Sequence, residues 1–141
     1  MPRQDTKLEA EGAEFLVLSQ LLIQHIPAYK AYTNMPGYDI IAHNPKTNWS
    51  AKIQVKSRWR TGAPFFLVKN FDCDFLVAVR LNRGRKGGGV TPSAPDFFVL
   101  PVTAACELVR DRGTTWSKIV FRDIDEKYTD KWSLIAEFLA G

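Results

Sequence analysis

Apolar and polar residues follow two periods along the chain, and these periods predict its elements. From Thr6 to about Ile26 the apolar residues recur at helical spacing; Thr6 with Glu9 has capping-box spacing, and Pro27 is expected to end the helix. Runs of β-favouring and apolar residues predict strands at 28–33, 65–68, 74–81, 96–100 and 117–122. Further helices are expected at 101–110 and 130–139, and residues 82–89 form a predicted flexible basic loop.

Two more strands, 37–42 and 52–58, form a predicted hairpin around which the other elements are arranged. The connection at 43–50 is rich in the Asn, Pro and Thr of turns. Side chains alternate between the two faces of a strand, so Asp39 and Ile40 point to opposite faces of the first strand. In the second strand Lys52, Gln54, Lys56 and Arg58 share one face. A carboxylate, a carboxamide and an ammonium group therefore converge on one surface. Because such groups are costly in a strand unless paired or solvated, their gathering indicates a functional site.

Two acids of the first predicted helix also stand out. At about 100° per residue Glu14 projects into the middle of the apolar arc, and Glu11 lies toward its edge. A carboxylate there should be unfavourable unless a positive group faces it. The alternative that both acids lie at the rim of the helix stays open.

The order of elements predicts an α/β or α+β fold with a mixed β-sheet flanked by helices, in a single domain over residues 1–141. No apolar run reaches about 18 residues, so no membrane span is expected. The N-terminus lacks the apolar stretch of a secretory signal. The two cysteines lack metal-binding spacing, and a reduced cytoplasmic setting is the simplest expectation.

Positive charge is concentrated in the middle of the chain. Residues 28–91 hold eleven basic and three acidic side chains, whereas both flanking regions are mildly acidic. This distribution is typical of a face that binds a polyanion. A solvated basic surface with no ligand is the alternative.

Asp39 followed by Gln54-Val55-Lys56 resembles the core motif of the PD-(D/E)XK nucleases. The resemblance extends from the first helix to Arg58 and implies a restriction-endonuclease-like three-layer core. Tyr38 stands where the family often has Pro, and Gln54 where it usually has Asp or Glu. The group I intron homing endonuclease branch is similar in accepting Gln, and the Holliday-junction-resolvase-like branch is also similar. The family usually has a helix after the lysine-bearing strand; residues 59–73 look unhelical, so the helix at 101–110 would have to cover that face.

The resemblance also implies roles for single residues. It implies a catalytic set of Glu14, Asp39, Gln54 and Lys56, in which Lys56 orients the attacking water. It implies Mg²⁺ or Mn²⁺ as cofactor, held by Asp39, Gln54, the Val55 carbonyl and Glu14 (directly or through water), with Glu11 as second choice for the helix acid. Because Gln54 removes one negative charge, weaker metal affinity is expected, or in the extreme no catalysis.

The expected partner is DNA. Arg58 and Arg60 follow the motif and are expected to contact phosphates. The predicted basic loop at 82–89 can bind along the DNA backbone or be a surface loop without function. The full set of expected DNA-binding residues is Lys52, Arg58, Arg60, Arg83, Arg85 and Lys86. Trp59 can stack on a base or pack on the sheet, and Trp49, Trp116 and Trp132 are expected to be packing residues.

Three interpretations follow. The first is a metal-dependent DNA endonuclease that cuts both strands as a homodimer or higher oligomer. The second is a catalytically inactive nuclease-fold module that binds nucleic acid or a protein partner. The third is an unrelated α+β domain with a coincidental motif.

Overall fold

The computed structural model describes residues 6–31, 37–112 and 115–141. The first half of the chain holds one helix and five strands: α1 (Thr6–Ile23), β1 (Ala28–Lys30), β2 (Ile40–Asn44), β3 (Trp49–Arg58), β4 (Phe65–Val68) and β5 (Phe75–Arg80). The second half contains β6 (Asp96–Pro101), α2 (Val102–Glu107), β7 (Asp111–Arg112), β8 (Ser117–Val120), two 3₁₀ turns, η1 (Phe121–Asp123) and η2 (Glu126–Tyr128), and α3 (Ser133–Ala140).

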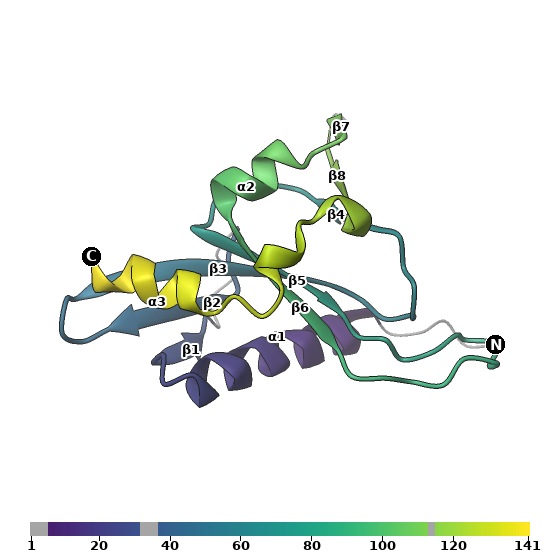
Figure 1. Ribbon diagram of the computed structural model, residues 1–141, viewed down its shortest axis with the longest axis horizontal. Coiled ribbons are helices and arrows are strands. Elements are labelled where there is room, and N and C mark those ends of the chain that lie inside the picture. The colour runs from purple at the N-terminus through teal and green to yellow at the C-terminus, as the bar shows by residue number, and fades with distance from the viewer. Residues whose placement is uncertain (1–5, 32–36, 113–114) are drawn as a thin grey trace.

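A five-stranded mixed sheet forms the centre of the fold, in the order β1-β2-β3-β5-β6 (Figure 1). Only β3 and β5 run parallel; the other neighbours are antiparallel. A smaller antiparallel sheet, β4-β8-β7, lies beside it. The predicted fold class, a mixed sheet flanked by helices, is confirmed.

Side-chain alternation divides the core into two apolar clusters, one on each face of the large sheet. On one face α1 and α3 pack against β2, β3, β5 and β6, with Val17, Ile53, Val77 and Ile135 fully buried. On the other face α2 and the small sheet pack against Leu76 and Leu100. The helix at 102–107 therefore covers the face that residues 59–73 leave open, as predicted.

The predicted hairpin is confirmed, but the first strand runs over 40–44 rather than 37–42, so Asp39 precedes it, and the second strand begins at 49 rather than 52. Strands β2 and β3 pair antiparallel with Ile40 opposite Ile53 and Asn44 opposite Trp49. This register places Asp39 beside Gln54 in the middle of β3, and the Asp39 backbone N–H donates a 2.8 Å bond to the Ile53 carbonyl. The site therefore forms where β2 begins.

Several predicted boundaries are wrong. Helix α1 ends at Ile23 rather than Ile26, because His25 adopts a φ of 62° and Ile26 N–H bonds back to Leu21, the Schellman arrangement of a helix end. The strand expected at 117–122 turns into a 3₁₀ helix at Phe121. Of the strand expected at 28–33, β1 covers 28–30; residues 32–33 lie outside the described part of the chain.

The short strand β7 was not predicted, and both later helices are shorter than expected. Within the described residues, no helix has the length and apolar character needed to cross a membrane.

Candidate active site

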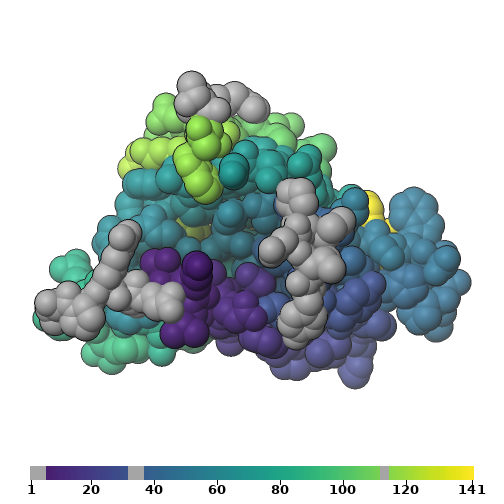
Figure 2. All heavy atoms as spheres, turned by 180° about the vertical axis from the view of Figure 1, so that it is seen from behind, coloured from purple at the N-terminus to yellow at the C-terminus, as the bar shows by residue number. Residues whose placement is uncertain are grey.

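A cleft of about 800 Å³ opens where β2 begins and β3 ends. The C-terminal half of β3 runs along it, the first turns of α1 form one wall, and residues near β4 and β8 form the other. In Figure 2 the dark purple start of α1 and the yellow-green segment near residue 116 border the blue and teal surface between them. The lining includes all four predicted catalytic residues, Glu14, Asp39, Gln54 and Lys56, together with Val55.

The Asp39 carboxylate is held in one orientation. Its Oδ2 accepts a 2.8 Å hydrogen bond from the Val55 backbone N–H, across the β2–β3 pair. The Asp39 backbone is fixed too, since its N–H donates to Ile53 and its carbonyl accepts a 2.9 Å bond from Ala31 N–H. A carboxylate anchored through one oxygen can present the other to a cation in the cleft.

Gln54 is 95% buried. It lies on the face of β3 that is directed toward the small sheet. Its amide nitrogen donates to the carbonyls of Asn70 at 3.0 Å and Gly37 at 3.2 Å, and lies 3.8 Å from Cys73 Sγ. All three contacts use Nε2, and Oε1 accepts no hydrogen bond from the residues that the structure describes. Gln54 thus joins the two turns that close this end of the cleft while it offers a neutral oxygen.

The positive group expected opposite the helix acids is Lys30, which sequence reasoning missed. Its side chain is 4% exposed and forms an ion pair with Glu11; Glu14 Oε1 lies 3.4 Å from the same Nζ. The Nζ also lies 4.3 Å from the centre of the Phe15 ring. Glu14 is 19% exposed and lines the cleft, whereas Glu11 is 52% exposed and does not, which favours Glu14 over Glu11 as the site acid.

Burial raises the pKa of Glu14 and of Asp39, two of the carboxylates that line the cleft, above their ordinary values. For Glu14, burial is the main cause and the Asp39 charge adds to it, against the attraction of Lys30. For Asp39, burial again raises the pKa, while the Val55 N–H, Lys56 and Lys30 oppose the rise. The positive neighbours therefore do not fully offset the burial of these two carboxylates, and a bound cation would stabilise their charged forms.

Lys56 extends from β3 into the same cleft and is close enough to Asp39 to lower its pKa. It forms no ion pair within 4.0 Å among the described residues. Its ammonium group is thus available to a water molecule or to a phosphate oxygen.

Three of the six predicted DNA-binding residues, Arg58, Arg60 and Lys86, line the cleft. Lys52 lies outside it, with Nζ 5.4 Å from the centre of the Tyr38 ring, and Arg85 is exposed beyond it. Arg83 is held within its own loop by bonds to the carbonyls of Leu81 and Ser93. The basic loop therefore contributes one side chain to the cleft.

The four tryptophan side chains agree only in part with their predicted packing roles. Trp132 is buried as expected, and Trp59 packs against the main core while it also lines the cleft. Trp116 is 46% exposed and lines the cleft, so its assignment as a packing residue is wrong. Trp49 is 50% exposed, although its ring meets Phe138 edge-on.

Further lining residues were not singled out from sequence: Glu9, Lys69 and Asn70. The sequence pattern gives Glu9 a place in the helix cap only, but its Oε1 is buried with no hydrogen-bond partner among the described residues. A buried carboxylate oxygen without a donor calls for a cation or water. No group of three His, Cys, Asp or Glu side chains suited to a metal ion occurs in residues 6–31, 37–112 and 115–141. A metal site here would thus need the Gln54 amide or backbone oxygens.

Comparison with known proteins bears on the fold. No protein-family model and no curated protein sequence matches the chain. Among solved structures, the bacterial homing endonuclease I-Ssp6803I superposes with a TM-score of 0.65 at 21% identity, over 97% of both chains. Hjc, a Holliday junction resolvase from Archaeoglobus fulgidus, superposes with a TM-score of 0.50 at 17% identity, over 82% of this chain and 87% of its own. The chain therefore shares its fold with a homing endonuclease and a Holliday junction resolvase.

Proposed function

We propose that this protein is a metal-dependent DNA endonuclease of the PD-(D/E)XK type, in which residues 1–141 act as one domain. The observation that carries the proposal is the single cleft that brings Glu14, Asp39, Gln54 and Lys56 together. The fold shared with two enzymes named as a homing endonuclease and a Holliday junction resolvase supports the same function.

The residues of the cleft fit a divalent cation. Asp39 and Glu14 supply carboxylates whose pKa values are raised by burial, and Gln54 supplies an amide oxygen that has no hydrogen bond to the described residues. Oxygen donors of this kind suit Mg²⁺ or Mn²⁺, which retain several waters and accept substrate phosphate oxygens. Asp39, Gln54, the Val55 carbonyl and Glu14 would hold the ion. The ion would polarise the phosphate and lower the pKa of a bound water.

The protein's own groups have separate tasks in this proposal. Lys56 orients the attacking water and offsets the charge that develops on the phosphorus oxygens. The Val55 N–H keeps Asp39 oriented, and the Gln54 bonds to Asn70 and Gly37 hold the cleft in shape. Lys30 limits the repulsion between Glu14 and Asp39 without entering the cleft lining.

DNA is the proposed substrate because the cleft is mainly positive. Its described lining includes five basic side chains, Lys56, Arg58, Arg60, Lys69 and Lys86, against three acids, Glu9, Glu14 and Asp39. Phosphate groups dominate the affinity of proteins for DNA. Since the described part of the chain forms one such cleft, we propose that two copies, a homodimer, cut the two strands of a duplex.

A second candidate is a catalytically inactive DNA-binding module of the same fold. It is favoured by the neutral Gln54 and by the lack of a three-ligand cluster among the described residues. The two candidates differ in chemistry and share the basic cleft.

The test is incubation of the full chain with supercoiled plasmid and with a four-way junction, in Mg²⁺, in Mn²⁺ and in chelator. The proposal expects nicked or linear products with either metal and none in chelator. Salt-sensitive DNA binding without products, across both metals and both substrates, would favour the inactive module.

A further inference from the structure

A second hollow, of about 510 Å³, lies at the junction of the small sheet with the large one. Four cationic side chains and two aromatic rings line it: Arg80, Arg110, Lys118, Arg122, Phe65 and Phe121. No acidic residue is among its described lining residues. The hollow is therefore a basic site with an apolar wall.

Strand alternation explains why these residues face outward. In β8 and β4, Ile119 and Phe66 pair across the strands and are buried in the core. Their neighbours Lys118 and Phe65 must then lie on the opposite face of the small sheet. The Nζ of Lys118 lies 4.5 Å from the centre of the Phe65 ring.

Arg80 brings a further positive charge from the large sheet. It pairs in register with Arg58 on the neighbouring parallel strand β3, so two residues of like charge are adjacent on the sheet. Directly opposed like charges destabilise a sheet unless an anion compensates them. Asp96 provides part of the compensating negative charge, since its Oδ2 lies 3.1 Å from Arg80 Nη2. Arg80 Nε is buried with no hydrogen-bond acceptor among the described residues.

The remaining charges leave the hollow positive. Asp123 binds Arg110 through two hydrogen bonds of 2.6 and 2.7 Å. Lys118 and Arg122 have no ion pair within 4.0 Å in the part of the chain that the structure describes. Arg122 is exposed and Lys118 half-buried, so both can reach a ligand.

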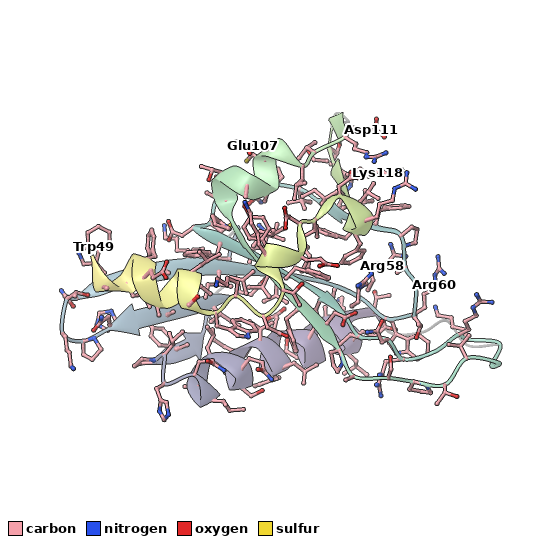
Figure 3. All side chains as sticks on the ribbon, in the orientation of Figure 1. Trp49, Arg58, Arg60, Glu107, Asp111 and Lys118 are labelled. Carbon is pink, nitrogen blue, oxygen red and sulfur yellow. The ribbon has the colours of Figure 1, made fainter. Side chains whose placement is uncertain are left out.

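The cleft and the hollow meet at Phe65. The guanidinium of Arg58, which lines the cleft, donates to the Phe65 carbonyl and lies 5.5 Å from the centre of its ring. Lys118 contacts the same ring from the hollow. Figure 3 shows Arg58, Arg60 and Lys118 on one side of the molecule. Cationic groups thus continue from the cleft, past Phe65, into the hollow.

We propose that the hollow binds backbone phosphates of the DNA that occupies the cleft, at nucleotides outside the proposed cleavage site. This inference rests on the proposed action on DNA and adds a contact region outside the cleft. A continuous row of cations suits a chain of phosphodiesters better than a single small anion, because each side chain can meet a separate phosphate. The half-buried Phe65 ring can pack against the apolar face of a deoxyribose, while the buried Phe121 ring forms part of the apolar wall.

The experiment measures binding alone, so it does not depend on catalysis. The double variant Lys118→Ala/Arg122→Ala and the control Lys46→Ala/Lys131→Ala lose the same charge, and all four side chains are half-buried or exposed. Fluorescence anisotropy gives Kd in chelator, over a series of salt concentrations, for a long duplex and for a short one. The variant Lys118→Arg/Arg122→Lys keeps both charges.

For the long duplex, the double variant should bind more weakly, and the slope of log K against log salt should become shallower by about two. The control should match the wild-type slope, the charge-keeping variant should restore it, and the short duplex should show a smaller loss. Equal slopes for the double variant and the wild type would overturn the inference, as would an equal loss in the control.

Inorganic phosphate and a deoxynucleoside monophosphate distinguish a small-anion site from a DNA site. The DNA assignment is wrong if either compound raises the Tm of the wild type and not that of the double variant, while the two proteins have equal slopes of log K against log salt for DNA. A shallower slope together with failure of cleavage in all metals would uphold the hollow and overturn only the nuclease proposal.

Discussion

Gln54 donates a 3.0 Å hydrogen bond from its amide nitrogen to the backbone carbonyl of Asn70. The same nitrogen donates to Gly37, so two carbonyl acceptors face this one side chain in a buried position. An ionised carboxylate has no hydrogen to donate and would instead be repelled by both carbonyls. The geometry therefore gives a physical reason for Gln at a position where the resembled family usually has an acid.

Replacing this amide by a carboxylate should harm the protein. Gln54→Glu is expected to lower the free energy of unfolding by about 1–3 kcal/mol, since two buried acceptors lose their donor. Urea unfolding measures this, with the exposed Gln24→Glu as the matched control. An unchanged stability together with faster cleavage would show that the amide is not needed to hold the two turns.

Lys30 should control the pH at which the site binds metal. Its charge lowers the pKa of both Glu14 and Asp39, and a carboxylate must be deprotonated to bind an ion. Lys30→Met should therefore move the midpoint of Mn²⁺ binding to higher pH. Glu11→Gln removes a charge that raises both pKa values, so this change should move the midpoint downward. Identical midpoints in all three proteins would contradict the role given to Lys30.

The raised pKa of Asp39 also has a consequence for stability. Between the ordinary Asp pKa and the raised folded value, the folded protein binds more protons than the unfolded chain, so the free energy of unfolding falls as pH rises. Asp39→Asn removes this loss and can still accept the bond from Val55 N–H. In chelator, the variant should be more stable than the wild type at neutral pH and equal to it in acid.

Metal should reverse that order, since an ion that binds only the folded state raises Tm. Mn²⁺ is expected to raise the Tm of the wild type and to leave Asp39→Asn unchanged. A wild-type Tm that does not respond to Mn²⁺ or Mg²⁺ would argue against the metal site.

Trp116 is expected to stack on a DNA base. Trp116→Ala should cost about 1–3 kcal/mol of DNA binding free energy without loss of fold, because the ring is 46% exposed in the cleft. Trp49→Ala, 50% exposed and outside the cleft lining, is the matched control. Equal affinities of the two variants for DNA would rule out the stacking role.

The sequence predicted the hairpin and the convergence of Asp39, Gln54 and Lys56, because period-two alternation in paired strands depends on local pattern alone. The covering role of the helix at 102–107 followed from the lack of any helix signal in residues 59–73. These features needed no knowledge of distant contacts.

Other features depended on contacts between distant segments. Lys30 lies on a strand whose pairing carries it to Glu11 and Glu14 on α1, and its own neighbours give no sign of this. Trp116 reaches the cleft only because β8 pairs with β4. The end of α1 was misplaced because the left-handed His25, and not Pro27, ends the helix.

The most direct test of the nuclease proposal separates chemistry from binding at Lys56. Single-turnover cleavage of DNA in Mg²⁺ would be compared for the wild type, Lys56→Ala and the exposed control Lys46→Ala, with DNA affinity measured in chelator. The proposed site predicts a rate at least about 100-fold lower for Lys56→Ala, a far smaller change in affinity, and an unaffected control. Equal cleavage rates for the wild type and Lys56→Ala would contradict the proposed active site.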